Sequence, residues 1–213
     1  KVTRREFVLT LLSFGLAAPI AGQLLMHAGI AQAQTPSTYK PTKRGGGGAV
    51  KTLWWQGATL LNPHFATGTK DQDGSRIFYE PLASWDPDGN LAPILASEIP
   101  TAQNDSLSKE GRSVTCHLKK NAVWHDGKPF TADDCVFTWE YCADPATASV
   151  SIATYKDVKV EKVDSHTIKV HFKKPTPFWA DAFCGVGGMI LAKHVFGGFK
   201  GDKSREGPAN RKT

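Results

Sequence analysis

The sequence contains few of the residues from which zinc and redox sites are built. Four cysteines occur in 213 residues, and no two of them have C-x-x-C spacing. That spacing is typical of zinc ribbons and thioredoxin-like sites, so the sequence argues against both. The cysteines are Cys116, Cys135, Cys142 and Cys184.

Motifs for a nucleophile or a phosphate-binding loop are also missing. No serine stands in a G-x-S-x-G context, which excludes the nucleophile turn of an α/β-hydrolase. The glycines at 45–48 precede Lys51 and Thr52, but Val50 occupies the position at which a P-loop requires glycine. We therefore expect no enzymatic activity, no metal and no other cofactor.

Clusters of positive charge are absent as well. The net charge is +6, but Lys and Arg are interspersed with acidic residues rather than gathered. This distribution does not favour nucleic acid as a partner. Hydrophobic residues make up 40% of the chain and charged residues 22%, proportions that are typical of a soluble globular protein with one or two domains.

Residues 1–33 have the pattern of a signal peptide. Arg4 and Arg5 lie in the segment T-R-R-E-F-V-L, which resembles the twin-arginine export motif, and a long apolar run follows. Ala31 and Ala33 form the small-x-small pattern that signal peptidase cleaves. An anchoring transmembrane helix is the alternative, which a proline and many small residues within the run disfavour. No cysteine follows the run, so lipid anchoring is not indicated.

The next segment changes from a linker to folded chain. Residues 34–48 are rich in Thr, Pro, Lys and Gly without periodicity, which is typical of a flexible linker. Residues 49–55 combine β-branched, aromatic and other apolar residues and predict a first buried strand. Asn62 and Pro63 then predict a turn, in which His64 is interpreted as a stabilising residue rather than a metal ligand.

A helix and a hairpin are predicted next. Apolar residues recur at helical spacing within 71–82, and Asp73 is expected to cap this helix. Two short apolar runs at 82–85 and 91–93 flank the segment D-P-D-G-N, which favours a β-hairpin.

Residues 113–141 contain the strongest local signals of the chain. The first six alternate between apolar and polar, as in a half-buried strand. Asp126 and Gly127 suit a tight turn, because glycine tolerates positive φ. Thr131 can cap a helix whose first turn carries acidic residues.

The remainder predicts another hairpin and little more regular structure. Residues 158–163 and 166–172 alternate and are joined by a short polar turn. A short aromatic helix is expected at 178–183. Residues 201–213 are polar and basic and are expected to form a tail.

A family resemblance becomes visible in the central stretch. The segment W-H-D-G-K-P-F-T-A-D-D at 124–134 closely resembles the signature of the family 5 extracellular solute-binding proteins, the peptide- and nickel-binding components of ABC importers. The segments Y-E-P-L at 79–82 and P-T-P-F at 175–178 match the same family. Departures are small, with Asn121 where an acidic residue is common and Cys135 where valine is common.

The resemblance implies an α/β fold of the periplasmic-binding-protein type II-like class. Residues 49–82 would begin the first lobe, and 83–200 would form a small mixed α/β subdomain that carries the signature. Residues 201–213 would be a polar tail at which this chain stops relative to the family. The implied function is capture of peptides or peptide-like solutes in the periplasm and delivery to a membrane ABC permease, by a monomer.

The resemblance also implies ligand contacts and leaves an alternative. The loop after the predicted turn faces the ligand in the family, which makes Phe65, Thr67, Gly68 and Thr69 candidates, although an ordinary surface loop explains these residues equally well. The acidic residue that holds a peptide's amino terminus lies, in relatives, in a part that this chain lacks, so weak binding is expected. The alternative is a truncated remnant that acts at most as an interaction module.

The expected periplasmic location permits disulfides. Cys142 follows the signature helix and Cys184 ends the predicted aromatic helix, so a disulfide between them is a hypothesis. Cys116 falls on the apolar side of its strand and is expected to be buried as a small hydrophobic residue.

Overall fold

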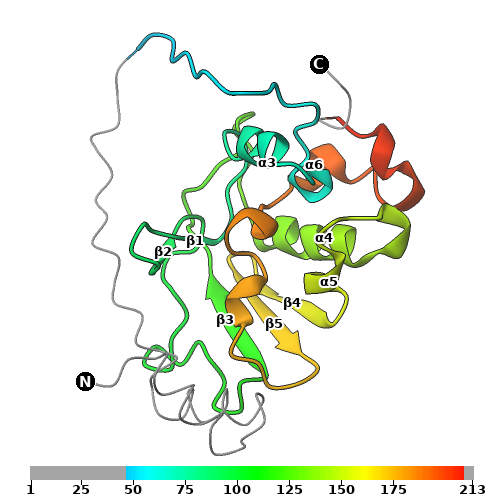
Figure 1. Ribbon diagram of the computed structural model, residues 1–213. Coiled ribbons are helices and arrows are strands. Elements are labelled where there is room, and N and C mark those ends of the chain that lie inside the picture. Colours follow the sequence, from blue (N-terminus) through cyan, green and yellow to red (C-terminus); the bar gives the residue numbers. More distant parts are fainter. Residues whose placement is uncertain (1–46, 209–213) are drawn as a thin grey trace, which may run out of the picture.

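The computed structural model describes residues 47–208 (Figure 1). A three-stranded sheet with helices on one side forms the body, and a two-stranded hairpin lies beside it. No helix among these residues is long and apolar enough to cross a membrane. The helices and strands are α3 (Thr69–Ser75), β1 (Ala83–Trp85), β2 (Leu91–Pro93), β3 (Ser113–His117), α4 (Ala132–Ala143), α5 (Ile152–Tyr155), β4 (Val158–Asp164), β5 (Thr167–Phe172) and α6 (Lys193–Phe196).

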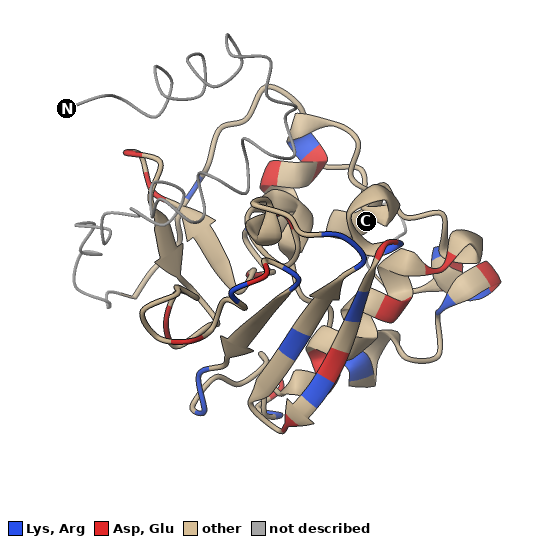
Figure 2. Ribbon diagram, turned by 90° about the horizontal axis from the view of Figure 1, so that it is seen from below, with Lys and Arg blue, Asp and Glu red and all other residues tan. Residues whose placement is uncertain are grey.

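The three-stranded sheet has the order β3-β5-β4, with both pairs antiparallel. Residues on alternate positions point to opposite faces of a sheet. One face is apolar and buried against α4, with Val114, Cys116 and Ile168 among its residues. Charged residues on β4 and β5 line the other face (Figure 2). The predicted strand, the second hairpin and the buried position of Cys116 are confirmed.

Helix α4 begins at the predicted cap. The side chain of Thr131 accepts a hydrogen bond from the backbone N–H of Asp133 at 3.3 Å. In return, the carboxylate of Asp134 accepts from the backbone N–H of Thr131 at 3.0 Å, so the two form a capping box. The other Asp134 oxygen accepts from the backbone N–H of Lys193 at 2.9 Å, which joins the start of α4 to α6.

The turns predicted at Asp126–Gly127 and at 86–90 are confirmed. Gly127 has a φ of +83°, and the backbone N–H of Trp124 donates to the carbonyl of Lys128 across the turn at 2.8 Å. The hairpin of β1 and β2 closes on Asp86, whose Oδ1 accepts from the backbone N–H of Asn90 at 2.8 Å.

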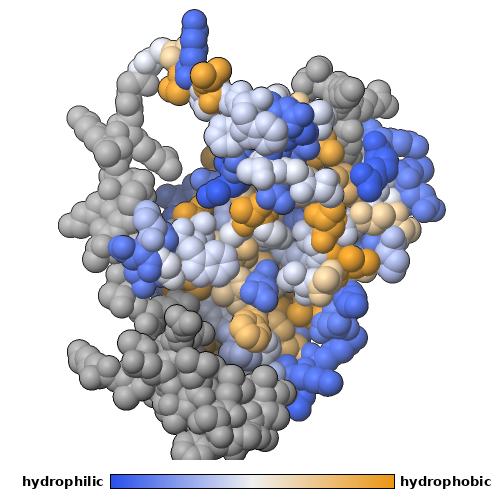
Figure 3. All heavy atoms as spheres, in the orientation of Figure 1, coloured by the Kyte–Doolittle hydropathy of each residue, from blue (hydrophilic) through white to orange (hydrophobic). Residues whose placement is uncertain are grey.

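Two predictions in the N-terminal part are wrong. Residues 49–55 form no strand, and Val50 and Leu53 are 93% and 96% exposed. A strand requires a pairing partner, and no described residue pairs with this segment, which stands away from the body of the molecule (Figure 3). Helix α3 starts at Thr69 with Gly68 at the N-cap, so Asp73 lies inside the helix rather than capping it.

The aromatic helix is shorter than expected, and the described part of the predicted tail is folded. Trp179–Asp181 form one 3-10 turn. Gly201–Glu206 form a 3-10 helix in which the backbone N–H of Gly201 donates to the Thr147 hydroxyl at 3.1 Å. The Ser204 hydroxyl donates to the Thr147 carbonyl at 3.3 Å, so this segment packs against the chain just after α4.

The predicted disulfide between Cys142 and Cys184 is not formed, because both are buried free thiols. Cys142 lies in the main core at the end of α4, whereas Cys184 packs with Ala83 and Leu91 in a separate small cluster. Burial raises the pKa of Cys184 to about 12 and also raises the pKa of Cys142. The two cysteines pack in different clusters, so their positions at the ends of two predicted helices did not predict a disulfide correctly.

Candidate ligand-binding site

The candidate loop follows a turn that is held from within the core. Asn62 is fully buried and precedes the 3-10 helix Pro63–Phe65. Its Oδ1 accepts from the backbone N–H of His64 at 3.0 Å, and its Nδ2 donates to the Tyr141 hydroxyl at 3.2 Å. The bond to Tyr141 fixes the turn to α4. The bond to the His64 N–H is the kind that an asparagine at an N-cap makes.

His64 connects the turn to two distant segments. Its Nε2 donates to the carbonyl of Met189 at 2.8 Å, which leaves Nδ1 to accept from the Ser151 hydroxyl at 3.1 Å. Its own carbonyl accepts from the backbone N–H of Val150 at 2.9 Å. Burial lowers the pKa of His64 to about 4, although the bond to the Met189 carbonyl opposes this shift. The imidazole is therefore neutral near pH 7, and its interpretation as a turn-stabilising residue is confirmed.

Phe65 supports the loop from below. The side chain is 4% exposed, and its ring centroid lies 6.1 Å from that of Tyr141. The guanidinium carbon of Arg205 lies 3.8 Å from the Phe65 ring centroid, a cation–π contact. Of the four residues predicted to contact ligand, Phe65 is the one whose side chain is enclosed by protein.

Thr67, Gly68 and Thr69 lie together at the surface. Both threonines are exposed, and Gly68 is extended, with φ −102° and ψ 149°. The carbonyl of Gly68 accepts from the backbone N–H groups of Asp71 and Gln72, both at 3.0 Å. Among residues 47–208, no acceptor is bound by the backbone N–H groups of residues 67–69. Three backbone donors of this surface loop are therefore left without a protein acceptor within residues 47–208.

The carboxylate of Asp71 fixes the other end of this loop. It accepts from the backbone N–H of Thr59 at 2.6 Å and from Nζ of Lys70 at 2.7 Å. Burial alone would raise the pKa of Asp71, but the hydrogen bonds from Lys70, Thr59 and Leu60 lower it overall. The carboxylate thus stays ionised and holds the start of α3 against residues 59 and 60.

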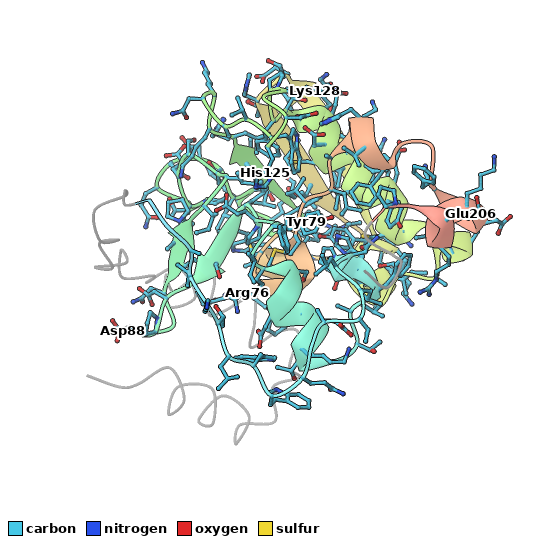
Figure 4. All side chains as sticks on the ribbon, turned by 90° about the horizontal axis from the view of Figure 1, so that it is seen from above. Arg76, Tyr79, Asp88, His125, Lys128 and Glu206 are labelled. Carbon is cyan, nitrogen blue, oxygen red and sulfur yellow. The ribbon has the colours of Figure 1, made fainter. Side chains whose placement is uncertain are left out.

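A groove runs along the face beyond the end of α3. Two adjoining hollows of about 410 and 360 Å³ share Arg76 and Glu80 in their walls. Figure 4 shows Tyr79 between Arg76 and His125 on this face. Burial raises the pKa of Tyr79 to about 12, so its hydroxyl stays protonated. No local pattern in the sequence predicts this groove, because its walls come from segments about 45 residues apart in the chain.

The groups that the loop offers to a ligand are hydrogen-bond donors. The open groups of the loop are backbone donors, which can pair with carbonyl oxygens of an extended ligand. No cluster of metal-ligating side chains occurs among the described residues. The predicted export residues Arg4, Arg5, Ala31 and Ala33 lie outside the described part of the chain.

Comparisons with known proteins find relatives among solute-binding proteins. The periplasmic oligopeptide-binding protein OppA of Escherichia coli K12 is 30% identical over 182 residues, which cover 77% of this chain and 31% of OppA. A crystal structure of Haemophilus influenzae OppA with the peptide RPPGFSPFR matches with a TM-score of 0.58 and 27% identity, covering 67% of this chain and 31% of that one. NikZ from Campylobacter jejuni, solved with Ni(L-His), matches with a TM-score of 0.56 and 26% identity over 68% of this chain and 27% of NikZ.

These likenesses confirm the expected α/β, type II-like fold in partial form. The chain spans about a third of the length of the relatives it matches. Residues 90–210 match the profile described as "Bacterial extracellular solute-binding proteins, family 5 Middle", and the candidate loop lies before that range. This match spans more than half of the sequence, and the chain belongs to the family 5 bacterial extracellular solute-binding proteins.

Proposed function

We propose that this chain is part of the periplasmic solute-binding component of an ABC importer, which captures peptides or peptide-like solutes and delivers them to a membrane permease. Membership of family 5 supports this role, as does the similarity to the oligopeptide-binding protein OppA. Binding proteins of this kind act by closing two lobes over a ligand. The proposal includes no enzymatic step.

One observation carries the proposal for the site, namely the open backbone donors of residues 67–69. Backbone groups that recognise the main chain of a peptide leave its side chains free to vary. The exposed position of both threonines and the extended backbone of Gly68 suit such contacts. Thr67, Gly68 and Thr69 are the proposed ligand-binding residues, and Phe65 supports them through its packing on Tyr141.

Peptides fit this loop better than the nickel complex bound by NikZ. A peptide presents a row of carbonyl acceptors, which complement a row of N–H donors. The H. influenzae relative was solved with the nonapeptide RPPGFSPFR, so this peptide is a suitable first probe. Weak binding is expected, because the chain covers 31% of that relative.

Export by the twin-arginine translocase is part of the proposal. Arg4 and Arg5 would be read by the translocase, and cleavage after Ala33 would release the mature chain as a monomer. Replacement of both arginines by lysine should retain the unprocessed chain in the cytoplasm. Periplasmic, processed protein from that variant would refute this route.

The ligand proposal can be tested by titration of the ¹⁵N-labelled chain of 213 residues with RPPGFSPFR. Amide resonances of residues 67–69 are expected to shift together in a saturable manner. Free arginine serves as the control, because it has the charge of the peptide's terminal residues without its peptide bonds. Saturable shifts that leave these three amides unchanged would contradict the proposed site.

A further inference from the structure

We propose a second binding site, at one end of the three-stranded sheet, that holds a tetrahedral oxyanion such as a phosphate or sulfate group. The site is a hollow of about 740 Å³ lined by residues that follow β3 and by the turn between β4 and β5. None of its lining residues belongs to the candidate peptide loop. This inference therefore stands apart from the proposed function.

The strand order brings the two halves of this site together. Strands β3 and β4 both pair antiparallel with β5. The last residues of β3 and β4 therefore lie beside the first residue of β5, at one end of the sheet. In the register, His117 lies opposite Thr167, and the backbone N–H of Leu118 donates to the carbonyl of His166 at 2.8 Å. Lys119 and Lys120 leave the sheet beside this turn, and both line the hollow.

The hollow contains lysine charges that are not paired with any carboxylate of residues 47–208. Lys119 and Lys120 form no ion pair with any residue in the described part of the chain. Asp164 is the one acidic residue in the wall. Its carboxylate accepts from the backbone N–H of His166 at 2.6 Å, and its pKa is lowered by this bond, by a hydrogen bond from the Thr167 side chain and by the charges of His166 and His117. The hollow is thus lined by two lysines and by one carboxylate that already accepts a hydrogen bond.

The remaining polar groups add hydrogen-bond donors. Nδ1 of His117 contacts the Thr167 hydroxyl at 3.4 Å, and Nδ1 of His166 contacts the Ser165 hydroxyl at 2.9 Å. The Nε2 atom of each ring has no partner among residues 47–208. Both rings line the hollow, together with the amide of Asn121.

This donor set fits an oxyanion better than a cation or an apolar ligand. Two lysines, two histidines and an asparagine, all able to donate hydrogen bonds, line the hollow from two segments, whereas a phosphate or sulfate group presents several acceptor oxygens. Charge-assisted hydrogen bonds to such groups are short and strong. The ligand class is therefore a phosphate or sulfate group, either free, on a soluble ester, or on a lipid headgroup.

Sulfate is the sharpest probe, because its charge does not change over the working pH range. We would titrate the full chain with sodium sulfate at constant ionic strength and follow the ring resonances of His117 and His166. Half-saturation is expected at roughly 1 mM. The double variant Lys119→Ala/Lys120→Ala should weaken binding by at least about tenfold, and Lys119→Arg/Lys120→Arg should retain it.

Lys156→Ala/Lys159→Ala is the matched control, because it removes two exposed lysines that form no ion pair with a described residue and lie outside the hollow. It should leave the affinity for sulfate unchanged. Linear shifts without saturation, or equal weakening by both alanine pairs, would overturn the proposal, because either result means a general effect of charge.

A vesicle arm identifies the source of the oxyanion. Sedimentation with phosphatidylglycerol vesicles but not phosphatidylcholine vesicles, reversed by sulfate, would assign the site to an anionic headgroup. Sulfate saturation without sedimentation would assign it to a soluble phosphate or sulfate group. Sedimentation that the Lys119→Ala/Lys120→Ala variant retains would count against the site.

Discussion

At the scale of single residues, the buried imidazole of His64 links the stability of the fold to pH. Its pKa is about 4 in the folded chain and 6.5 in its unperturbed state. The unfolded chain therefore takes up the proton first as the pH falls, and folding becomes less favourable between about pH 6.5 and 4. The whole shift corresponds to about 3 kcal/mol of unfolding free energy.

Urea unfolding at pH 7.5 and at pH 4.5 would measure this loss. A His64→Gln variant keeps a donor for the Met189 carbonyl but cannot be protonated, so its stability should change much less over the same interval. Asp71 and Asp133 have lowered pKa values, so the stability that these carboxylates contribute is lost only at lower pH. Equal pH dependence in the variant and in the unmutated chain would refute the role of His64.

The four cysteines are expected to behave as buried hydrophobic residues. All four are free and buried, and burial raises the pKa of each thiol. A thiol reagent should react with none of them in the folded chain, because the reactive thiolate form is suppressed. In denaturant without reductant the count should be four thiols per chain. A count of two would indicate that the chain forms a disulfide, in contradiction to the structure.

At the scale of the elements, the start of α4 depends on the capping box of Thr131 and Asp134. Thr131→Ala removes the acceptor for the N–H of Asp133 and should lower the unfolding free energy by about 1 kcal/mol. Thr131→Ser keeps that acceptor and should cost much less. Chemical unfolding of both variants at pH 7 would measure the difference, and equal losses would mean that methyl packing rather than the cap is responsible.

Local signals explain which elements were predictable from the sequence. The strand, the turn at Gly127 and the cap at Thr131 depend on residues close in the chain, and all three occur as expected. Residues 49–55 have strand-forming side chains but no pairing partner among the described residues, so their composition alone wrongly predicted a strand. The helix predicted within 71–82 is observed at Thr69–Ser75, because Gly68, rather than Asp73, takes the extended cap conformation.

The candidate site was only partly predictable, for the same reason. Thr67 and Thr69 are exposed as a ligand loop requires. The burial of Phe65 depends on Tyr141 and Arg205, which lie about 76 and 140 residues further along the chain. The contacts of His64 with Ser151 and Met189 also span 87 and 125 residues. Such long-range contacts leave no periodic pattern in a single sequence.

At the scale of the whole molecule, three distant segments hold one loop in place. The turn at 62–65, the segment at 149–151 and Met189 meet around His64, and α3 is fixed by Asp71 on the other side. A loop held at both ends loses little freedom on binding, which favours recognition by its backbone. We therefore propose that this backbone, rather than the threonine side chains, contacts the peptide.

Thr69 allows this claim to be tested without disturbing the fold. It is the first residue of α3, a position that accepts proline well. Gly68 before it is already extended, as the residue before a proline must be. Thr69→Pro therefore removes one N–H donor and leaves the helix intact, whereas Thr69→Ala keeps the donor and removes the hydroxyl.

The decisive measurement is the affinity of these two variants and of the unmutated chain for RPPGFSPFR, by titration under identical conditions. Loss of one hydrogen bond should weaken the binding of Thr69→Pro by about fivefold, while Thr69→Ala should bind like the unmutated chain. Unchanged binding by Thr69→Pro would contradict the account, and weakened binding by Thr69→Ala alone would assign recognition to the side chain instead.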